Sequence, residues 1–223
     1  MILRLVIADG SQSPAVAESV EVAEDGALTG WRSVSDGGVG WFAGRLPAAE
    51  LAEIQALIGA AGAAPPPARP RPEAAEEVLE LTATGPVRIA GLTDGPGDWP
   101  RLAAASRRLL DRLTDFPRAA VGVSRTPGGG ARLEHRGTDP VRVDLGTVAV
   151  TATAWRGYYE PAGDWAGEVT GPGEVEAGPE WTYDLPIGFE PAGPDVTVHL
   201  TADFVILSGP TRIPVRAKYT PDA

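Results

Sequence analysis

The first half of the chain mixes two hydrophobic periods, one of two residues and one of three to four. Strand-like alternation occurs near residues 2–9, 16–23, 28–31, 39–45, 77–83 and 86–92. Helical spacing occurs over 47–60, where Gly59 and Gly62 are expected to end the helix, and again between Asp98 and Leu113. We therefore expect an α+β domain over residues 1–116, with an antiparallel sheet and two helices.

The pattern changes after Pro117, because no helical period is found beyond it. Short apolar runs separated by turn residues lie near 119–125, 131–136, 141–145, 147–155, 181–188, 196–207 and 211–219. The stretch from Glu134 to Val141 also has the strand–polar turn–strand pattern common in immunoglobulin-like modules. These features predict an all-β, immunoglobulin-like sandwich over residues 117–223.

Composition excludes several classes of protein. The chain has 223 residues with a formal net charge of −11, and we find no basic patch, so nucleic acid is not an expected partner. No apolar run is long enough to cross a membrane, and Met1–Gly10 lacks the basic start of a signal peptide, so we expect a cytoplasmic protein. The chain has no cysteine, which removes disulfides, thiolate catalysis and cysteine metal sites.

The N-terminal half resembles the emfourin type of small protease inhibitor that is found beside bacterial metalloproteases. The resemblance rests on the glycine-spaced strand 38–44, the helix 46–58, the paired strands near 77–92 and the helix that ends at Arg108–Leu113. It implies an inhibitory protein whose partner is a protease. We assign no inhibitory residue from the family, because none can be matched to a position in this sequence.

Charge is distributed unevenly in the second half. No Lys or Arg occurs between Arg156 and Arg212, whereas ten acids do. Within this run, Tyr158–Pro179 is rich in Gly and Pro and shows no strand or helix period, which predicts a long loop; loops above roughly 12–15 residues are usually functional or disordered. Aromatic rings beside carboxylates suit a basic or amphipathic protein partner. The predicted partner-binding residues are Tyr158, Tyr159, Glu160, Asp164, Trp165, Glu168 and Trp181.

Two alternatives remain open for this segment. Its aromatic rings could close the end of the sandwich core, or its acids and rings could bind a carbohydrate or calcium. Catalysis has little support, because only His135 and His199 could act as imidazole bases and no nucleophile-elbow motif is present. We thus expect no catalytic residues, cofactor or metal. The predicted function is that of a non-enzymatic protein-binding module. The alternative is a carbohydrate- or metal-binding protein, or a hydrolase whose carboxylates converge in the fold.

Overall fold

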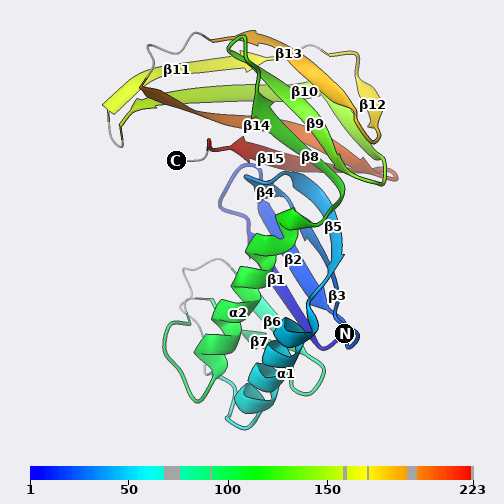
Figure 1. The fold of residues 1–223 in the computed structure, drawn as a ribbon, viewed down its shortest axis with the longest axis vertical. Coiled ribbons are helices and arrows are strands. Elements are labelled where there is room, and N and C mark those ends of the chain that lie inside the picture. Colours follow the sequence, from blue (N-terminus) through cyan, green and yellow to red (C-terminus); the bar gives the residue numbers. More distant parts are fainter. Residues whose placement is uncertain (68–75, 91, 158–159, 170, 190–194, 222–223) are drawn as a thin grey trace. The chain divides into compact units, whose positions relative to one another are not determined.

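The computed structural model describes residues 1–67, 76–90, 92–157, 160–169, 171–189 and 195–221. Within these residues the chain is β-rich, with two α-helices and with strands arranged in two sheets (Figure 1). The chain folds into two compact units. The first is Met1–Arg32 with Trp41–Phe116, and the second is Ser33–Gly40 with Pro117–Ala223. The second unit therefore includes a short segment from within the predicted N-terminal domain.

The first unit is built on an antiparallel meander extended by a hairpin. Its strands are β1 (Leu3–Asp9), β2 (Val16–Val22), β3 (Ala27–Arg32), β6 (Glu76–Leu81), β7 (Gly85–Arg88) and most of β5 (Val39–Arg45). They follow the order β5-β3-β2-β1-β6-β7. Leu5 pairs with Val20 on one side and Leu79 on the other, and all three side chains are buried. The period of two therefore forms one apolar face of the sheet.

Two helices complete this unit, α1 (Ala48–Gly62) and α2 (Trp99–Asp111), the latter followed by a 3-10 turn, η1 (Arg112–Asp115). Helix α2 packs against β1, β2 and α1, and its residues Trp99 and Leu102 are fully buried (Figure 1). The expectation that Gly59 ends α1 is wrong. Gly59 is exposed, and no heavy atom lies within 4 Å of where a Cβ would be. The glycine therefore only lowers the helix propensity at this position, and the helix continues to Gly62.

The second unit contains the remaining strands. They are β4 (Val34–Ser35), β8 (Pro117–Arg125), β9 (Gly130–Gly137), β10 (Val141–Arg156), β11 (Glu160–Glu168), β12 (Glu174–Ala177), β13 (Thr182–Gly188), β14 (Val196–Ser208) and β15 (Thr211–Tyr219). Strands β13-β9-β8 are neighbours in one sheet, and β11-β10-β14-β15-β4 form the other, where β12 also pairs with β10. Strand β8 contacts both β14 and β15. Buried side chains such as Leu133 and Phe204 come from both sheets.

Two expectations for this unit are wrong. The strands predicted at 141–145 and 147–155 are a single strand, β10, whose register with β14 shifts between Asp144 and Ala149. The segment 158–179, predicted as a loop without strands, contains β11 and β12. Glycines and prolines hid the alternation, because the positions of β11 that face the core are Gly163, Trp165 and Gly167 rather than aliphatic residues.

Candidate functional site

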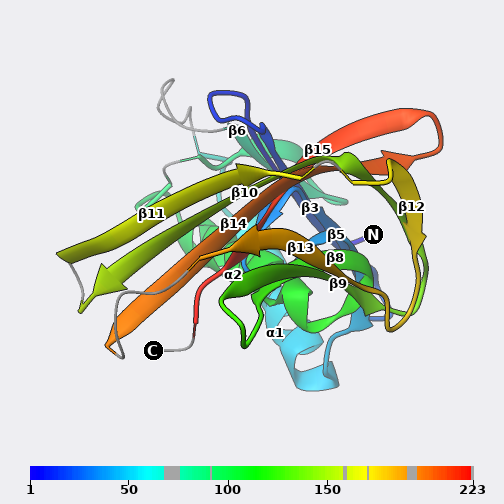
Figure 2. The ribbon, with the colours of Figure 1, turned by 90° about the horizontal axis from the view of Figure 1, so that it is seen from above.

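Strand β10 positions the acidic part of the second unit. One side of this strand pairs with β14, while its other side pairs first with β12, over Val141–Asp144, and then with β11, over Ala149–Arg156. Figure 2 shows β11 and β12 along the two halves of β10. We call β11 and β12 together the acidic edge. Its acids are Glu160, Asp164, Glu168, Glu174 and Glu176, and it carries no Lys or Arg.

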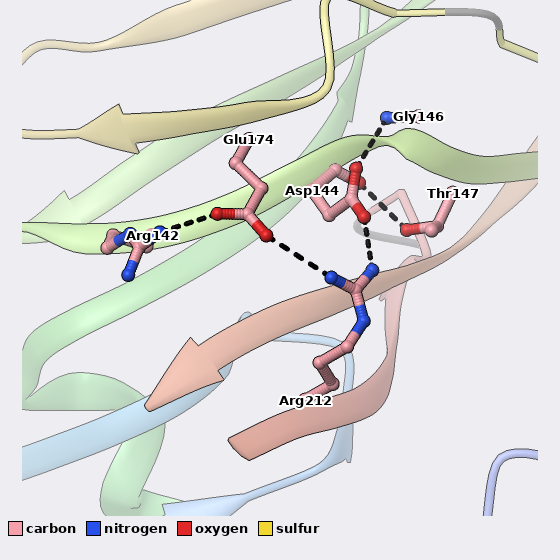
Figure 3. A network of polar contacts seen from close by, with 6 residues as sticks. All are labelled: Arg142, Asp144, Gly146, Thr147, Glu174 and Arg212. Atoms are coloured by element: carbon pink, nitrogen blue, oxygen red, sulfur yellow. Dashed lines mark hydrogen bonds and ion pairs between the residues drawn. The ribbon is translucent and has the colours of Figure 1, made fainter. Parts of the chain in front are cut away.

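At the β12 end, arginines of β10 and β15 bind two carboxylates, those of Glu174 and Asp144 (Figure 3). Glu174 accepts hydrogen bonds from Arg142 and, at 3.3 Å, from Arg212. Arg212 also donates to Asp144, a carboxylate whose side chain is only 12% exposed. The result is a continuous chain of charged groups, Arg142–Glu174–Arg212–Asp144.

Asp144 also fixes the backbone at the register shift of β10. Its Oδ1 accepts the Gly146 N–H at 2.9 Å, and its carbonyl oxygen accepts the Thr147 hydroxyl at 2.8 Å. The hydrogen bond from Arg212 lowers the pKa of the Asp144 carboxyl; burial opposes this effect, and the bond from Gly146 adds to it. This end of the edge is therefore a structural ion-pair network.

At the β11 end, Asp164 and Glu168 have no such partners. Asp164 lies opposite Thr153 and Glu168 lies opposite Ala149, so both acids share the outward face of the sheet. Both side chains are exposed, and neither forms an ion pair within the described parts of the chain. Glu176 of β12 is likewise exposed and forms no ion pair within the described parts of the chain.

Bases elsewhere in the second unit are mostly neutralised by their own neighbours. Arg216 holds Asp203 with two bonds of 2.6 and 2.7 Å. The other ion pairs are Arg118–Asp139, Arg132–Asp184, Arg136–Glu134 and Arg156–Glu160. Among the described residues, only Arg125 and Lys218 of this unit lack an ion pair. The surplus of negative charge is therefore concentrated in exposed acids of the run between Arg156 and Arg212.

The structure does not bring the predicted binding residues onto one surface. Tyr158 and Tyr159 lie outside the described residues. Glu160 pairs with Arg156 at 2.8 Å, and a register shift in the β10–β11 pairing separates it from Asp164. Asp164 and Glu168 remain together on the outward face.

Of the two predicted tryptophans, Trp165 faces the core side of β11 and Trp181 lies beside β9 of the other sheet. Trp165 pairs with the buried Ala152, and its ring lies 5.7 Å from that of buried Phe189. A Cβ on Gly163 would lie 2.6 Å from the Trp165 ring, so a larger residue at this position would displace the ring. Trp181 stacks on Tyr183 with ring centroids 6.3 Å apart. Trp165 thus closes the edge of the core, as expected if the aromatic rings of this segment serve packing and not binding.

Sequence reasoning missed the network around Asp144. A local signal was available for part of it, since Asp144 is followed by Gly146 and Thr147, the residue types that form a tight turn capped by a carboxylate. The partners Glu174 and Arg212 carry no local signal, because they reach Asp144 only through the registers of three strand pairs, β12–β10, β10–β14 and β14–β15.

The two histidines are separated in the fold. His135 is buried on β9, where its Nε2 lies 2.8 Å from the Asp139 carbonyl oxygen and its Nδ1 has no partner in the described chain. His199 lies on β14 opposite Thr153. Among the described residues there is no group of three potential metal-ligating side chains. Neither histidine therefore belongs to such a group within the described chain.

Comparisons with family models, with curated proteins and with solved structures each found no match. No helix in the described parts of the chain is both long enough and apolar enough to cross a membrane.

Proposed function

We propose that this chain is a non-enzymatic protein-binding module that holds a basic surface of a partner protein against its acidic edge. The observation that carries this proposal is the contrast between paired and unpaired charges. Asp164, Glu168 and Glu176 are exposed without an ion pair in the described chain, whereas most bases around them are neutralised internally. Unpaired surface acids steer and select a basic partner more than they stabilise the fold.

The strand partition supports an immunoglobulin-like sandwich as the scaffold. In chain order, the first, second and fifth long strands (β8, β9 and β13) are neighbours in one sheet, and β10, β14 and β15 are neighbours in the other. Immunoglobulin domains divide their strands A, B and E from C, F and G in the same way. Strands β11 and β12 then lie beside the strand that corresponds to C, at the open side of its sheet.

A protease is the first partner to test, because the N-terminal half resembles emfourin-type inhibitors. The assay is hydrolysis of a peptide substrate by the bacterial metalloprotease thermolysin, with and without an excess of the protein. Inhibition that saturates with added protein supports this part of the proposal. Unchanged hydrolysis at micromolar protein removes thermolysin-type enzymes as the partner class.

The acidic edge is tested by capture from a lysate of the source organism, followed by mass spectrometry. The edge variant is Asp164→Lys with Glu168→Lys. The control is Glu180→Lys with Asp195→Lys, which makes the same charge change at two exposed acids outside β11 and β12. We expect the wild type and the control to enrich the same protein, and the edge variant to lose it. Equal enrichment by all three proteins contradicts the proposal.

A second candidate, carbohydrate binding, has one specific observation in its favour. Trp155 shares the outward strand face with Thr151 and Thr153, and it pairs with the exposed Thr197 of β14. A partly exposed indole ring beside hydroxyl groups offers stacking and hydrogen bonds to a sugar. Calorimetry with a panel of neutral oligosaccharides, on wild type and Trp155→Ala, separates this function from the first. Binding that is lost in Trp155→Ala but kept in the Asp164/Glu168 variant favours it.

A further inference from the structure

Strand β11 has one unoccupied edge in the described structure. It is the terminal strand of its sheet, and its pairing with β10 uses one side of its nine residues. No described strand pairs with the other side. An edge strand presents a row of free backbone N–H and C=O groups, which is a template for a further strand.

The side chains of β11 leave this backbone accessible. On the outward face, the residue between Asp164 and Glu168 is Ala166, which is small and exposed, so no bulky side chain shields the centre of the strand there. Asp164 and Glu168 are four positions apart on that face, a separation of about 13 Å along an extended strand. An added antiparallel strand with bases four positions apart would place each base beside one of these acids.

The same charges disfavour pairing between two copies of this chain. If two β11 strands paired antiparallel around Ala166, Asp164 of each copy would face Glu168 of the other. Like charges directly opposite each other destabilise strand pairs, and charged edge strands are a known protection against self-association. The edge is therefore suited to a basic strand and unsuited to itself.

We infer that β11 binds its partner by strand addition, in which an extended basic segment of the partner protein forms one more antiparallel strand beside β11. The inference rests on the proposed protein-binding function and names its mode. Backbone hydrogen bonds hold the segment, and Asp164 and Glu168 select bases that are four positions apart on one face of it.

The test uses synthetic peptides as probes. The parent is a fluorescently labelled nonapeptide of alternating Thr and Val, with Arg at its third and seventh positions. Two derivatives carry backbone N-methyl groups on the odd or on the even residues, so that each blocks one of the two edges of the extended peptide. A fourth peptide has Glu in place of both Arg residues. Binding is followed by fluorescence anisotropy at two salt concentrations.

Strand addition uses only one edge of the peptide. We therefore expect one N-methylated peptide to lose affinity by about tenfold or more, and the other to bind like the parent, because several backbone hydrogen bonds are lost on one edge only. The Glu peptide should not bind. Asp164→Asn with Glu168→Gln should weaken the parent peptide several-fold, whereas Glu180→Gln, outside the edge strands, should leave its affinity unchanged.

Failure of this inference is distinguishable from failure of the proposed function. Equal binding of both N-methylated peptides shows that charge alone attracts the peptide, which overturns strand addition but leaves an acidic binding surface. Absence of parent binding at millimolar peptide also overturns strand addition. The proposed function fails only if the partner captured from lysate is retained by the Asp164→Lys/Glu168→Lys variant.

Discussion

The two halves of the acidic edge border the same strand, β10, and use their acids differently. Beside the first half of β10, Glu174 and the buried Asp144 are bound to Arg142 and Arg212. Beside the second half, Asp164 and Glu168 face Thr153 and Ala149 and have no ion pair in the described chain. The difference lies in the neighbouring residues, which include two arginines beside Glu174 and Asp144 but are uncharged opposite Asp164 and Glu168.

This contrast separates acids that stabilise the fold from acids that are available to a partner. A buried carboxylate with two kinds of donor is costly to disturb, because its removal leaves an arginine and a turn without their acceptor. An exposed carboxylate without a partner contributes almost nothing to folding. The change in the free energy of unfolding when each acid is removed therefore shows to which of the two groups that acid belongs.

The largest effect is expected from Asp144→Ala. The substitution removes the acceptor for Arg212 and for the Gly146 N–H at the register shift of β10. We expect the free energy of unfolding of the second unit to fall by about 2–4 kcal/mol, measured by urea denaturation at pH 7. Asp164→Ala, the same truncation at the other end, is the control and should change it by less than about 0.5 kcal/mol. Equal losses would show that the two ends do not differ.

The contribution of Asp144 should also depend on pH. Its pKa is lowered in the folded protein, chiefly by the hydrogen bond from Arg212, so the folded state binds this proton less readily than the unfolded state. The resulting stability is fully present above the usual aspartate pKa of 3.8 and is lost as the pH falls through the lower, folded value. The stability difference between wild type and Asp144→Asn should therefore be largest at pH 7 and shrink progressively below pH 4. A difference that is constant from pH 7 to pH 3 contradicts this assignment.

A somewhat smaller effect is expected at the connection between β11 and β12. A Cβ added to Gly171 would lie 2.7 Å from both Cβ and the carbonyl oxygen of Leu145, a buried residue at the register shift. We expect Gly171→Ala to lower the melting temperature, with a loss of about 1–3 kcal/mol from overpacking. Gly178→Ala is the matched control, because no heavy atom lies within 4 Å of its Cβ position. If the two variants have the same melting temperature, the packing of this connection is looser than the contact implies.

Much of the fold could be predicted because its interior strands repeat the period of two clearly. The predictions at 119–125, 196–207 and 211–219 correspond to β8, β14 and β15. Apolar residues alternate with polar ones in β14 and β15, whereas β8 contains a continuous buried run, 119–123. Strand β11 escaped prediction because its core-facing positions are two glycines and one tryptophan. An edge strand has only one partner, so packing imposes less on its sequence.

The candidate site could be predicted only in part. The run of acids without bases was visible, and Asp164 and Glu168 were selected from it. Their separation from Trp165 could not be foreseen, because it follows from strand alternation in a segment predicted to be a loop. Trp181 lies beside β9 of the other sheet, and no local pattern shows this. The pairing of Glu174 with Arg142 and Arg212 depends on register, which places residues far apart in sequence side by side.

A small stabilisation is expected at Glu180, another acid of the same run. Its φ of 65° lies in the left-handed region, where glycine is favoured, in the turn closed by the Trp181 N–H and the Gly178 carbonyl oxygen. Glu180→Gly should raise the free energy of unfolding by about 0.5–1 kcal/mol, since the relief of backbone strain exceeds the added freedom of the unfolded chain. Glu176→Gly, within β12, should instead destabilise the protein. A loss of stability in both variants would contradict the strain at Glu180.

The smallest effect on folding, and the most informative, is expected from Asp164→Asn combined with Glu168→Gln. Because neither acid has an ion pair in the described chain, the free energy of unfolding should change by less than about 0.5 kcal/mol. Association with a basic partner should nevertheless slow, and its rate should become less sensitive to salt, because the unpaired acids supply the long-range attraction. Stopped-flow or surface plasmon resonance measurements at two ionic strengths test this. A clear loss of stability with unchanged association would place these acids with Asp144, as structural groups, and remove the distinction between the two ends of the edge.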